Sequence, residues 1–155
     1  MLLHKEGIDP MIGIVVTVFV GIMGGIAVGV QSTIAGKMSQ QVGGAASSSI
    51  IHISGAILSA ILLVTRGGEQ IQNWRNLSWY MLGSGVFGVI LYLTLSHTIP
   101  RLGATSAIVL IIVGQLMMGM VIDQFGLFSI PIRPIDGYRI LATVLLIAGG
   151  YLMIR

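Results

Sequence analysis

Two polar side chains interrupt a strongly apolar stretch in the second half of the chain, the segment VGQLMMGMVIDQFG over residues 113–126. Gln115, Gly119 and Asp123 follow one another at intervals of four residues, so a helix would place all three on roughly one face. An amide and a carboxylate on a shared face can bind a small polar molecule, a proton or a cation. The stretch is therefore a candidate binding site, and its glycine leaves room for a ligand or a neighbouring backbone.

Composition identifies the solvent that surrounds this stretch. Of the 155 residues, 8% are charged and 55% are hydrophobic, and the mean hydropathy is +0.98, which no ordinary soluble domain of this size shows. The net charge of +3 comes from basic residues scattered at the ends of apolar runs, a membrane pattern rather than a nucleic-acid-binding one. The chain has no cysteine, which excludes disulfides, thiolate metal sites and cysteine nucleophiles. We expect a multi-pass membrane protein with no nucleic-acid partner.

Five apolar runs are long enough to cross about 30 Å of hydrocarbon, which takes roughly 20 helical residues. Segments rich in glycine, proline and polar residues separate the runs. Tryptophan and tyrosine fall near the predicted ends, where the headgroup region favours them. The pattern predicts an all-α, polytopic membrane protein with one domain over residues 1–155. The predicted spans are about 11–36, 45–65, 78–98, 103–124 and 137–154.

Small residues form stripes that predict helix packing. Gly21, Gly25 and Gly29 belong to a longer stripe of small residues four apart in the first run, and Gly88 belongs to a shorter one in the third run. Helices in lipid associate through close backbone contact at small residues and through interhelical hydrogen bonds. The stripes therefore indicate packing rather than chemistry, and we expect another helix to lie against the stripe of the first run.

Several motifs resemble those of a known family. They are PRLGA at residues 100–104, GQL at 114–116, Asp123 with FGL at 125–127, RP at 133–134, and, in the first half, GVQSTIAGKM at 29–38 and ISG at 53–55. Together they cover nearly the whole chain and resemble the YdcZ-type family of small inner-membrane exporters, within the drug/metabolite transporter superfamily. Two positions depart from the family pattern, which leads us to expect an asparagine at Ala35 and an aromatic residue near His52.

The resemblance implies a five-helix unit equivalent to half of a ten-helix transporter, located in the bacterial inner membrane. In the ten-helix relatives two inverted halves lie in one chain, so two copies of a five-helix chain would rebuild this arrangement as an antiparallel homodimer. Such dual insertion requires a weak orientation signal. The predicted topology places Lys5, Arg66, Arg75, Arg133 and Arg139 on the N-terminal side, against Lys37, Arg101 and Arg155 on the other. This bias weakly favours an N-terminus inside and is compatible with both orientations.

Polar side chains gather near one predicted membrane face. Gln31, near the end of the first span, and His52, near the start of the second, should lie at similar depth, and Tyr92 and His97 approach the same face from the third. One interpretation is a vestibule in which Gln31, His52 and Tyr92 bind substrate and His97 takes part in proton coupling. The alternative is interhelical hydrogen bonding, worth about 1 kcal/mol or less per pair, with His52 satisfied by a backbone carbonyl.

Gln115 and Asp123 differ in predicted depth. About twelve residues of the fourth span precede Gln115 and nine follow it, so the glutamine should lie near the midplane and is, with Gly119, the main candidate for binding substrate. Asp123 lies two turns further on, close to the opposite interface. It either pairs with Arg133 or Arg139 or serves as a proton or cation site. No acidic residue falls in the middle of a span, which argues against a plain copy of the proton/cation exchange used by the smallest transporters of the superfamily.

Enzyme chemistry is not indicated, because no histidine, carboxylate and serine set, metal-ligand spacing or phosphate loop occurs in a suitable context. We therefore expect no catalytic residue, metal or cofactor. One remaining interpretation is a secondary transporter that exports a small organic metabolite or drug-like compound by alternating access as a dimer. The other is a non-transporting scaffold, or an obligate subunit paired with a related five-helix chain. A transporter needs a cavity reached by Gln115, whereas a scaffold should bury that side chain in a dry helix contact.

Overall fold

The computed structural model describes residues 10–154, which form helices and no strand. Within this range, four helical stretches are long and apolar enough to cross a membrane by length and composition, namely 11–42, 44–65, 79–125 and 137–154. The all-α, polytopic membrane fold expected from the sequence is confirmed. The helices are α1 (Pro10–Val42), α2 (Gly44–Thr65), α3 (Trp79–Leu82), α4 (Gly85–Phe125) and α5 (Gly137–Ile154), with 3₁₀ turns at Ile71–Asn76 and Leu127–Ser129.

A single glycine joins α1 to α2. α1 continues past its predicted end at residue 36, through the mostly polar residues 37–41, to Val42. Gly43 follows with φ 86° and ψ 158°, a conformation that a side chain would disfavour, and its N–H donates to the carbonyl oxygen of Ser39 at 2.9 Å. Gly44 lets this corner lie close to α4, since a Cβ there would come 3.2 Å from the Cβ of Ser96. The corner therefore depends on two glycines with different roles.

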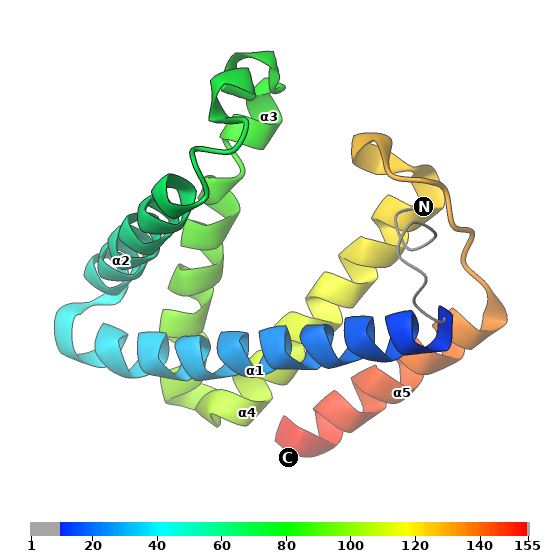
Figure 1. The fold of residues 1–155 in the computed structure, drawn as a ribbon. Coiled ribbons are helices and arrows are strands. Elements are labelled where there is room, and N and C mark those ends of the chain that lie inside the picture. The colour runs from blue at the N-terminus through cyan, green and yellow to red at the C-terminus, as the bar shows by residue number, and fades with distance from the viewer. Residues whose placement is uncertain (1–9, 155) are drawn as a thin grey trace.

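α4 combines the two spans predicted over 78–98 and 103–124 in one helical stretch. Helix continues through residues 99–102, where the sequence predicted a linker, and only Gly103 leaves the helical conformation, with φ 78° and ψ 164°. Pro100 has no N–H to donate to the preceding turn, and Gly103 tolerates positive φ, so the chain bends here without a loop. Figure 1 shows the two arms diverging from this corner, one green and one yellow.

The arms of α4 each have the length of one membrane crossing. The first arm (residues 85–102) is about 27 Å long and the second arm (residues 104–125) about 33 Å, at about 1.5 Å per residue. Both values are close to the roughly 30 Å of the hydrocarbon core. The two crossings predicted for this part of the chain are thus compatible with one bent helix, and the count of five crossings remains a prediction.

The buried core lies near the corner of α4, where α1 and α2 meet it. Ala35, Leu95 and Ile99 are buried there. Gly36 is pressed against the first arm of α4, because a Cβ at this position would come 2.7 Å from Cδ1 and Cγ2 of Ile99. The hydroxyl of Ser47 donates to the carbonyl oxygen of Ala35 at 3.1 Å, which ties α2 to α1. Small residues and a buried hydroxyl thus hold these helices together, as is usual in lipid.

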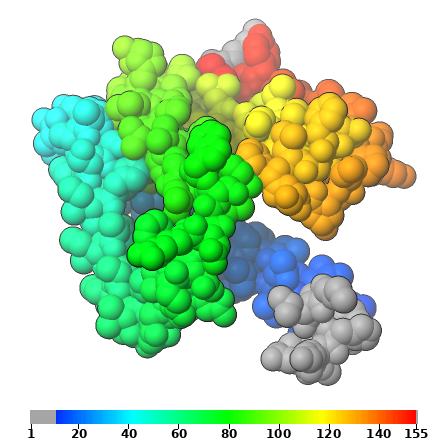
Figure 2. Space-filling model, turned by 90° about the horizontal axis from the view of Figure 1, so that it is seen from above, coloured from blue at the N-terminus to red at the C-terminus, as the bar shows by residue number. Residues whose placement is uncertain are grey.

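Outside this core the chain is open. Its solvent-accessible area is 11976 Å², whereas a compact soluble monomer of 16.4 kDa exposes about 7,500 Å². Figure 1 shows α2 beside the first arm of α4, whereas α5 packs against the second arm. Figure 2 shows a gap between these two parts, with α1 (blue) below it. About 4,500 Å² more surface is exposed than compact packing of one chain would leave.

The glycine stripe of α1 makes no close helix contact at Gly21, Gly25 or Gly29 within the described part of the chain, although Gly29 shares a cavity with Ala104 and Thr105 of α4. A Cβ added at Gly21, Gly25 or Gly29 would meet nothing within 4 Å. At Gly88, in contrast, a Cβ would come 2.8 Å from Nε2 of His52, so this glycine does lie in a close helix contact. No helix of residues 10–154 packs closely against these three glycines, so the helix that we expected there remains a prediction.

Candidate functional site

The stripe of Gln115, Gly119 and Asp123 faces a cavity between the second arm of α4 and α5. The cavity has a volume of about 320 Å³. Its lining residues are Gln115, Leu116, Gly119, Met120 and Asp123 from α4, and Arg139, Ala142 and Thr143 from α5. The three residues singled out from their spacing therefore do share one surface, and α5 supplies the opposite wall. We refer to this space as the α4–α5 cavity.

The segment between α4 and α5 is fastened to the end of α4. Gly126 ends α4 in a left-handed conformation, with φ 62° and ψ 33°, which glycine adopts readily. The side-chain Oε1 of Gln124 accepts a hydrogen bond from the N–H of Ile135 at 2.8 Å. The N–H of Arg133 donates to the carbonyl oxygen of Asp123 at 2.9 Å. These two contacts bring the start of α5 back beside the end of α4.

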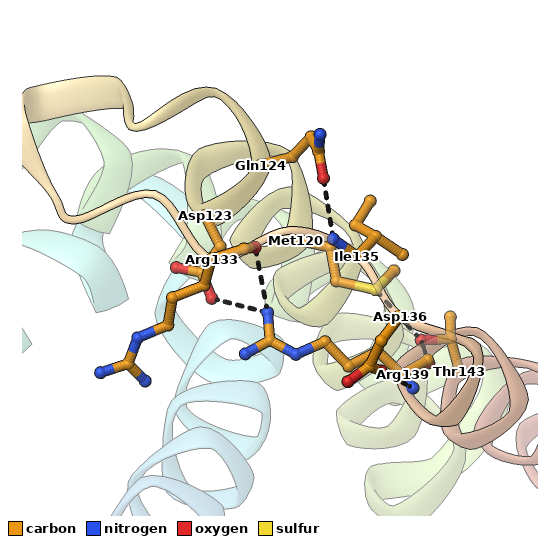
Figure 3. A network of polar contacts seen from close by, with 8 residues as sticks. All are labelled: Met120, Asp123, Gln124, Arg133, Ile135, Asp136, Arg139 and Thr143. Carbon is orange, nitrogen blue, oxygen red and sulfur yellow. Dashed lines mark hydrogen bonds and ion pairs between the residues drawn. The ribbon is translucent and has the colours of Figure 1, made fainter.

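An ion pair lines one end of the cavity. Oδ1 of Asp136 accepts the N–H of Arg139 at 2.8 Å, as an N-cap does, and so fixes the first turn of α5. Nη1 of Arg139 donates to Oδ2 of Asp123 at 3.2 Å, and both side chains are 33% exposed. Of the two partners predicted for Asp123, the structure shows Arg139. The guanidinium of Arg133 points away, and only its carbonyl oxygen approaches Arg139, at 3.5 Å (Figure 3).

The cavity leaves several polar atoms available to a ligand. The ion pair uses one nitrogen and one oxygen, whereas arginine and a carboxylate interact most strongly through two parallel hydrogen bonds. The amide of Gln115 makes no hydrogen bond within residues 10–154. The hydroxyl of Thr143 is already engaged, donating to the carbonyl oxygen of Arg139 at 2.8 Å and lying 3.4 Å from the sulfur of Met120. Over the described range, no cluster of three or more His, Asp or Glu side chains could hold a metal ion.

His52 and Tyr92 meet at a separate place, between α2 and the first arm of α4. Their rings contact edge to face, with centroids 5.3 Å apart. Nδ1 of His52 lies 2.7 Å from the carbonyl oxygen of Ser48. Because a carbonyl only accepts, Nδ1 carries a proton in this contact and Nε2 is the acceptor of the neutral ring. The carbonyl partner that we considered as the alternative for His52 is therefore present, although the ring also lines a cavity of about 390 Å³.

Gln31 and His97 lie away from both places. Gln31 is exposed and lines a cavity of about 500 Å³ between α1 and α2. His97 is exposed, and its carbonyl oxygen accepts a hydrogen bond from Nη1 of Arg101 at 2.6 Å. The predicted vestibule of Gln31, His52, Tyr92 and His97 is therefore not formed within one chain, where only His52 and Tyr92 come together. Similar depth does not place side chains on facing surfaces, because each helix also has its own rotation about its axis.

Two polar lining residues were not assigned to the site from the sequence. Arg139 was considered only as a partner of Asp123, and Thr143 was not singled out. Both lie on the cavity side of α5, four residues apart, which is the spacing of neighbours on one helix face. The sequence signal was present. Polar residues four apart on the predicted fifth span, like the stripe on the fourth span, would have pointed to Arg139 and Thr143.

Comparison with known proteins gives one result. A family model described as "Putative inner membrane exporter, YdcZ" matches residues 16–152, a range that contains every residue lining the α4–α5 cavity. No curated protein and no solved structure gives a significant match. The family inferred from the sequence motifs is thereby confirmed. The family description and the long apolar helices agree on the inner membrane as location and on transport rather than catalysis. The chain belongs to the YdcZ family of inner-membrane exporters.

Proposed function

We propose that the chain is a secondary transporter that exports a small organic metabolite or drug-like compound through the α4–α5 cavity. The observation that carries this proposal is the position of Gln115, whose side chain lines the cavity without a hydrogen-bond partner in residues 10–154. The Gln115 side chain is exposed in the single chain and lies in a helical stretch long and apolar enough to span a membrane, and an amide that meets apolar surroundings without a partner costs roughly 2–7 kcal/mol. The cost is avoided when water or a substrate occupies the cavity, as in a transporter. A scaffold would instead hold this amide in a dry contact between helices.

The depth of the cavity fits a transport site. Gln115 lies about 18 Å along the second arm from the corner at Gly103, and Asp123 lies about 12 Å further on, at about 1.5 Å per residue. The cavity therefore extends from near the middle of a membrane span toward one of its ends. Binding sites of secondary transporters lie near the midplane, where they can open to either side in turn.

We propose further that the working unit is an antiparallel homodimer. Two copies together carry about 9,000 Å² of excess exposed area, more than the roughly 2,000–5,000 Å² that the two partners of an obligate homodimer bury in total, so a dimer can form and still leave surface for lipid. The glycine stripe of α1, at Gly21, Gly25 and Gly29, offers a close-packing surface that no atom of the described chain approaches within 4 Å of an added Cβ. In such a dimer the second copy would cover these surfaces and complete an inverted pair with alternating access.

Transport assays on purified protein in proteoliposomes test the site. Compounds from a panel of small metabolites would be offered to the wild type and to Gln115→Leu. We expect the variant to lose tenfold or more of the flux of any compound that the wild type moves, because leucine cannot replace the amide. Met117→Leu is the matched control, since Met117 is on the same helix, is 50% exposed and does not line the cavity. Unchanged flux in Gln115→Leu would reject the site.

Cross-linking tests the dimer separately. Because the chain has no cysteine, Ile12→Cys and Ile154→Cys each introduce one reactive thiol at opposite ends of the described chain. An antiparallel dimer should give cross-links between the two variants when they are mixed. Cross-links only between identical variants would show a parallel arrangement and reject the antiparallel dimer.

A further inference from the structure

The α4–α5 cavity carries one charge of each sign at the same end. Asp123 and Arg139 face each other through a single hydrogen bond of 3.2 Å, and both side chains are partly exposed. The opposite sides of the two groups are unused: Oδ1 of Asp123 and the Nε and Nη2 atoms of Arg139 have no hydrogen-bond partner within residues 10–154. Charged hydrogen bonds are the strong class, and arginine prefers to make them in parallel pairs. Asp123 and Arg139 can therefore each bind a ligand through these unused atoms while both side chains stay in the cavity.

The charge balance of the pair decides which ligand fits. A ligand with only a carboxylate would draw Arg139 away from Asp123 and leave the partly buried aspartate charge without its partner. A ligand with only an ammonium group would do the same to Arg139. A ligand with both groups exchanges one ion pair for two, and the site stays neutral throughout.

We propose that the α4–α5 cavity binds a small zwitterion of the amino-acid type, with its carboxylate on Arg139 and its ammonium group on Asp123. This proposal rests on the proposed function, because it takes the cavity to be the substrate site. The rest of the lining suits an aliphatic side chain, since Leu116, Gly119, Met120 and Ala142 present apolar or small surfaces. A methionine adapts to ligands of different shape.

The size of the cavity limits the ligand. A volume of about 320 Å³ is at the lower end of the 300–1,000 Å³ of small-molecule sites. Gly119 keeps part of this space open, because an added Cβ would meet no atom within 4 Å. Gly119→Ala should therefore fold normally, and its methyl group should narrow the cavity and weaken the binding of the larger zwitterions first.

Four probes with the same aliphatic body separate the charge classes. They are leucine (zwitterion), leucinamide (cation), 4-methylpentanoate (anion) and 4-methylpentanamide (neutral). Thermal stabilisation of the purified full chain in detergent measures binding whether or not transport occurs. Flux in proteoliposomes is the second readout. We expect leucine to bind about tenfold or more tightly than each of the other three, since each of them lacks at least one charged hydrogen bond.

Charge-neutralising variants distinguish a binding pair from a pair that only holds α4 against α5. In Asp123→Asn the preferred probe should change from leucine to 4-methylpentanoate, and in Arg139→Gln it should change to leucinamide. A merely structural pair would lower stability and leave the order of the four probes unchanged. Arg133→Gln is the matched control, because its guanidinium points away from the pair (Figure 3) and the order should remain that of the wild type.

The outcomes separate this proposal from the proposed function. Equal stabilisation by all four probes, or none by leucine, overturns the zwitterion site, while flux of another compound would keep the transporter. In another outcome, leucine binds more tightly than the other three probes while neither leucine nor any other compound is transported. That result would support the zwitterion site and reject the transporter. If a variant does not fold, the order of the four probes on the wild type decides by itself.

Discussion

The contact between Gly36 and Ile99 can be tested by one substitution made at two places on α1. At Gly36 a Cβ would come 2.7 Å from Cδ1 and Cγ2 of Ile99 and 2.8 Å from its Cβ. The Cβ of Ile99 moves only with its backbone, so the helices must separate to admit even a methyl group. At Gly25 a Cβ would meet nothing within 4 Å. The two positions thus differ in packing and share the same helix.

The comparison isolates the packing cost. Replacing glycine by alanine inside a helix gains about 0.8–1 kcal/mol of helix propensity at either position, so this gain cancels in the difference between the two variants. Overpacking typically costs about 1–3 kcal/mol. For a chain of this size, 1 kcal/mol shifts Tm by about 2–4 °C. We therefore expect Gly36→Ala to melt about 2–12 °C below Gly25→Ala.

The assay is thermal unfolding in a mild detergent, followed by intrinsic fluorescence, at a concentration at which both variants are monomeric. Monomeric conditions matter because Gly25 belongs to the surface that we assign to the dimer. Equal melting temperatures, or a higher one for Gly36→Ala, would refute the close contact between α1 and the first arm of α4. Wild-type protein measured beside them shows whether Gly25→Ala itself is neutral or stabilising.

Further predictions concern the dimer, the corner of α4 and the contact between α4 and α5. Gly25→Leu should weaken dimerisation in detergent about tenfold, since overpacking costs about 1–3 kcal/mol, and unchanged dimer fractions on dilution would argue against the stripe as an interface. Gly103→Ala should lower Tm, because alanine disfavours φ 78° by roughly 1–2 kcal/mol, whereas Gly114→Ala in the same helix should not. Ser106→Ala removes the 2.9 Å hydrogen bond to the carbonyl oxygen of Met153, so a loss of about 1 kcal/mol is expected in chemical unfolding, and no loss would show that this contact does not stabilise the helix pair.

The sequence by itself predicted the elements that depend on local information. Hydropathy over a window of residues reflects the solvent that surrounds a helix, so the apolar runs and the membrane class could be inferred without any partner. The stripe of Gln115, Gly119 and Asp123 could be inferred in the same way, because residues four apart share a face in any regular helix. The structure bears out this common surface, which lines one cavity.

Local information was misleading at the junctions between helices. Pro100 and Gly103 both disfavour regular helix, and their combination predicted a linker between two spans. In the structure only Gly103 leaves the helical conformation, because a helix tolerates proline where a bend is present anyway. At the end of α1, the mostly polar residues 37–41 predicted a loop, yet the helix continues to Val42. Helix ends depend on what packs around them as much as on residue type.

Only the tertiary structure decided which polar groups meet. It pairs Asp123 with Arg139 rather than Arg133, it brings His52 to Tyr92, and it leaves Gln31 apart from them. Each outcome depends on the rotation of one helix relative to another and on the path of the connecting segment. Contacts between residues far apart in the chain set that rotation, and no local pattern in the sequence records it.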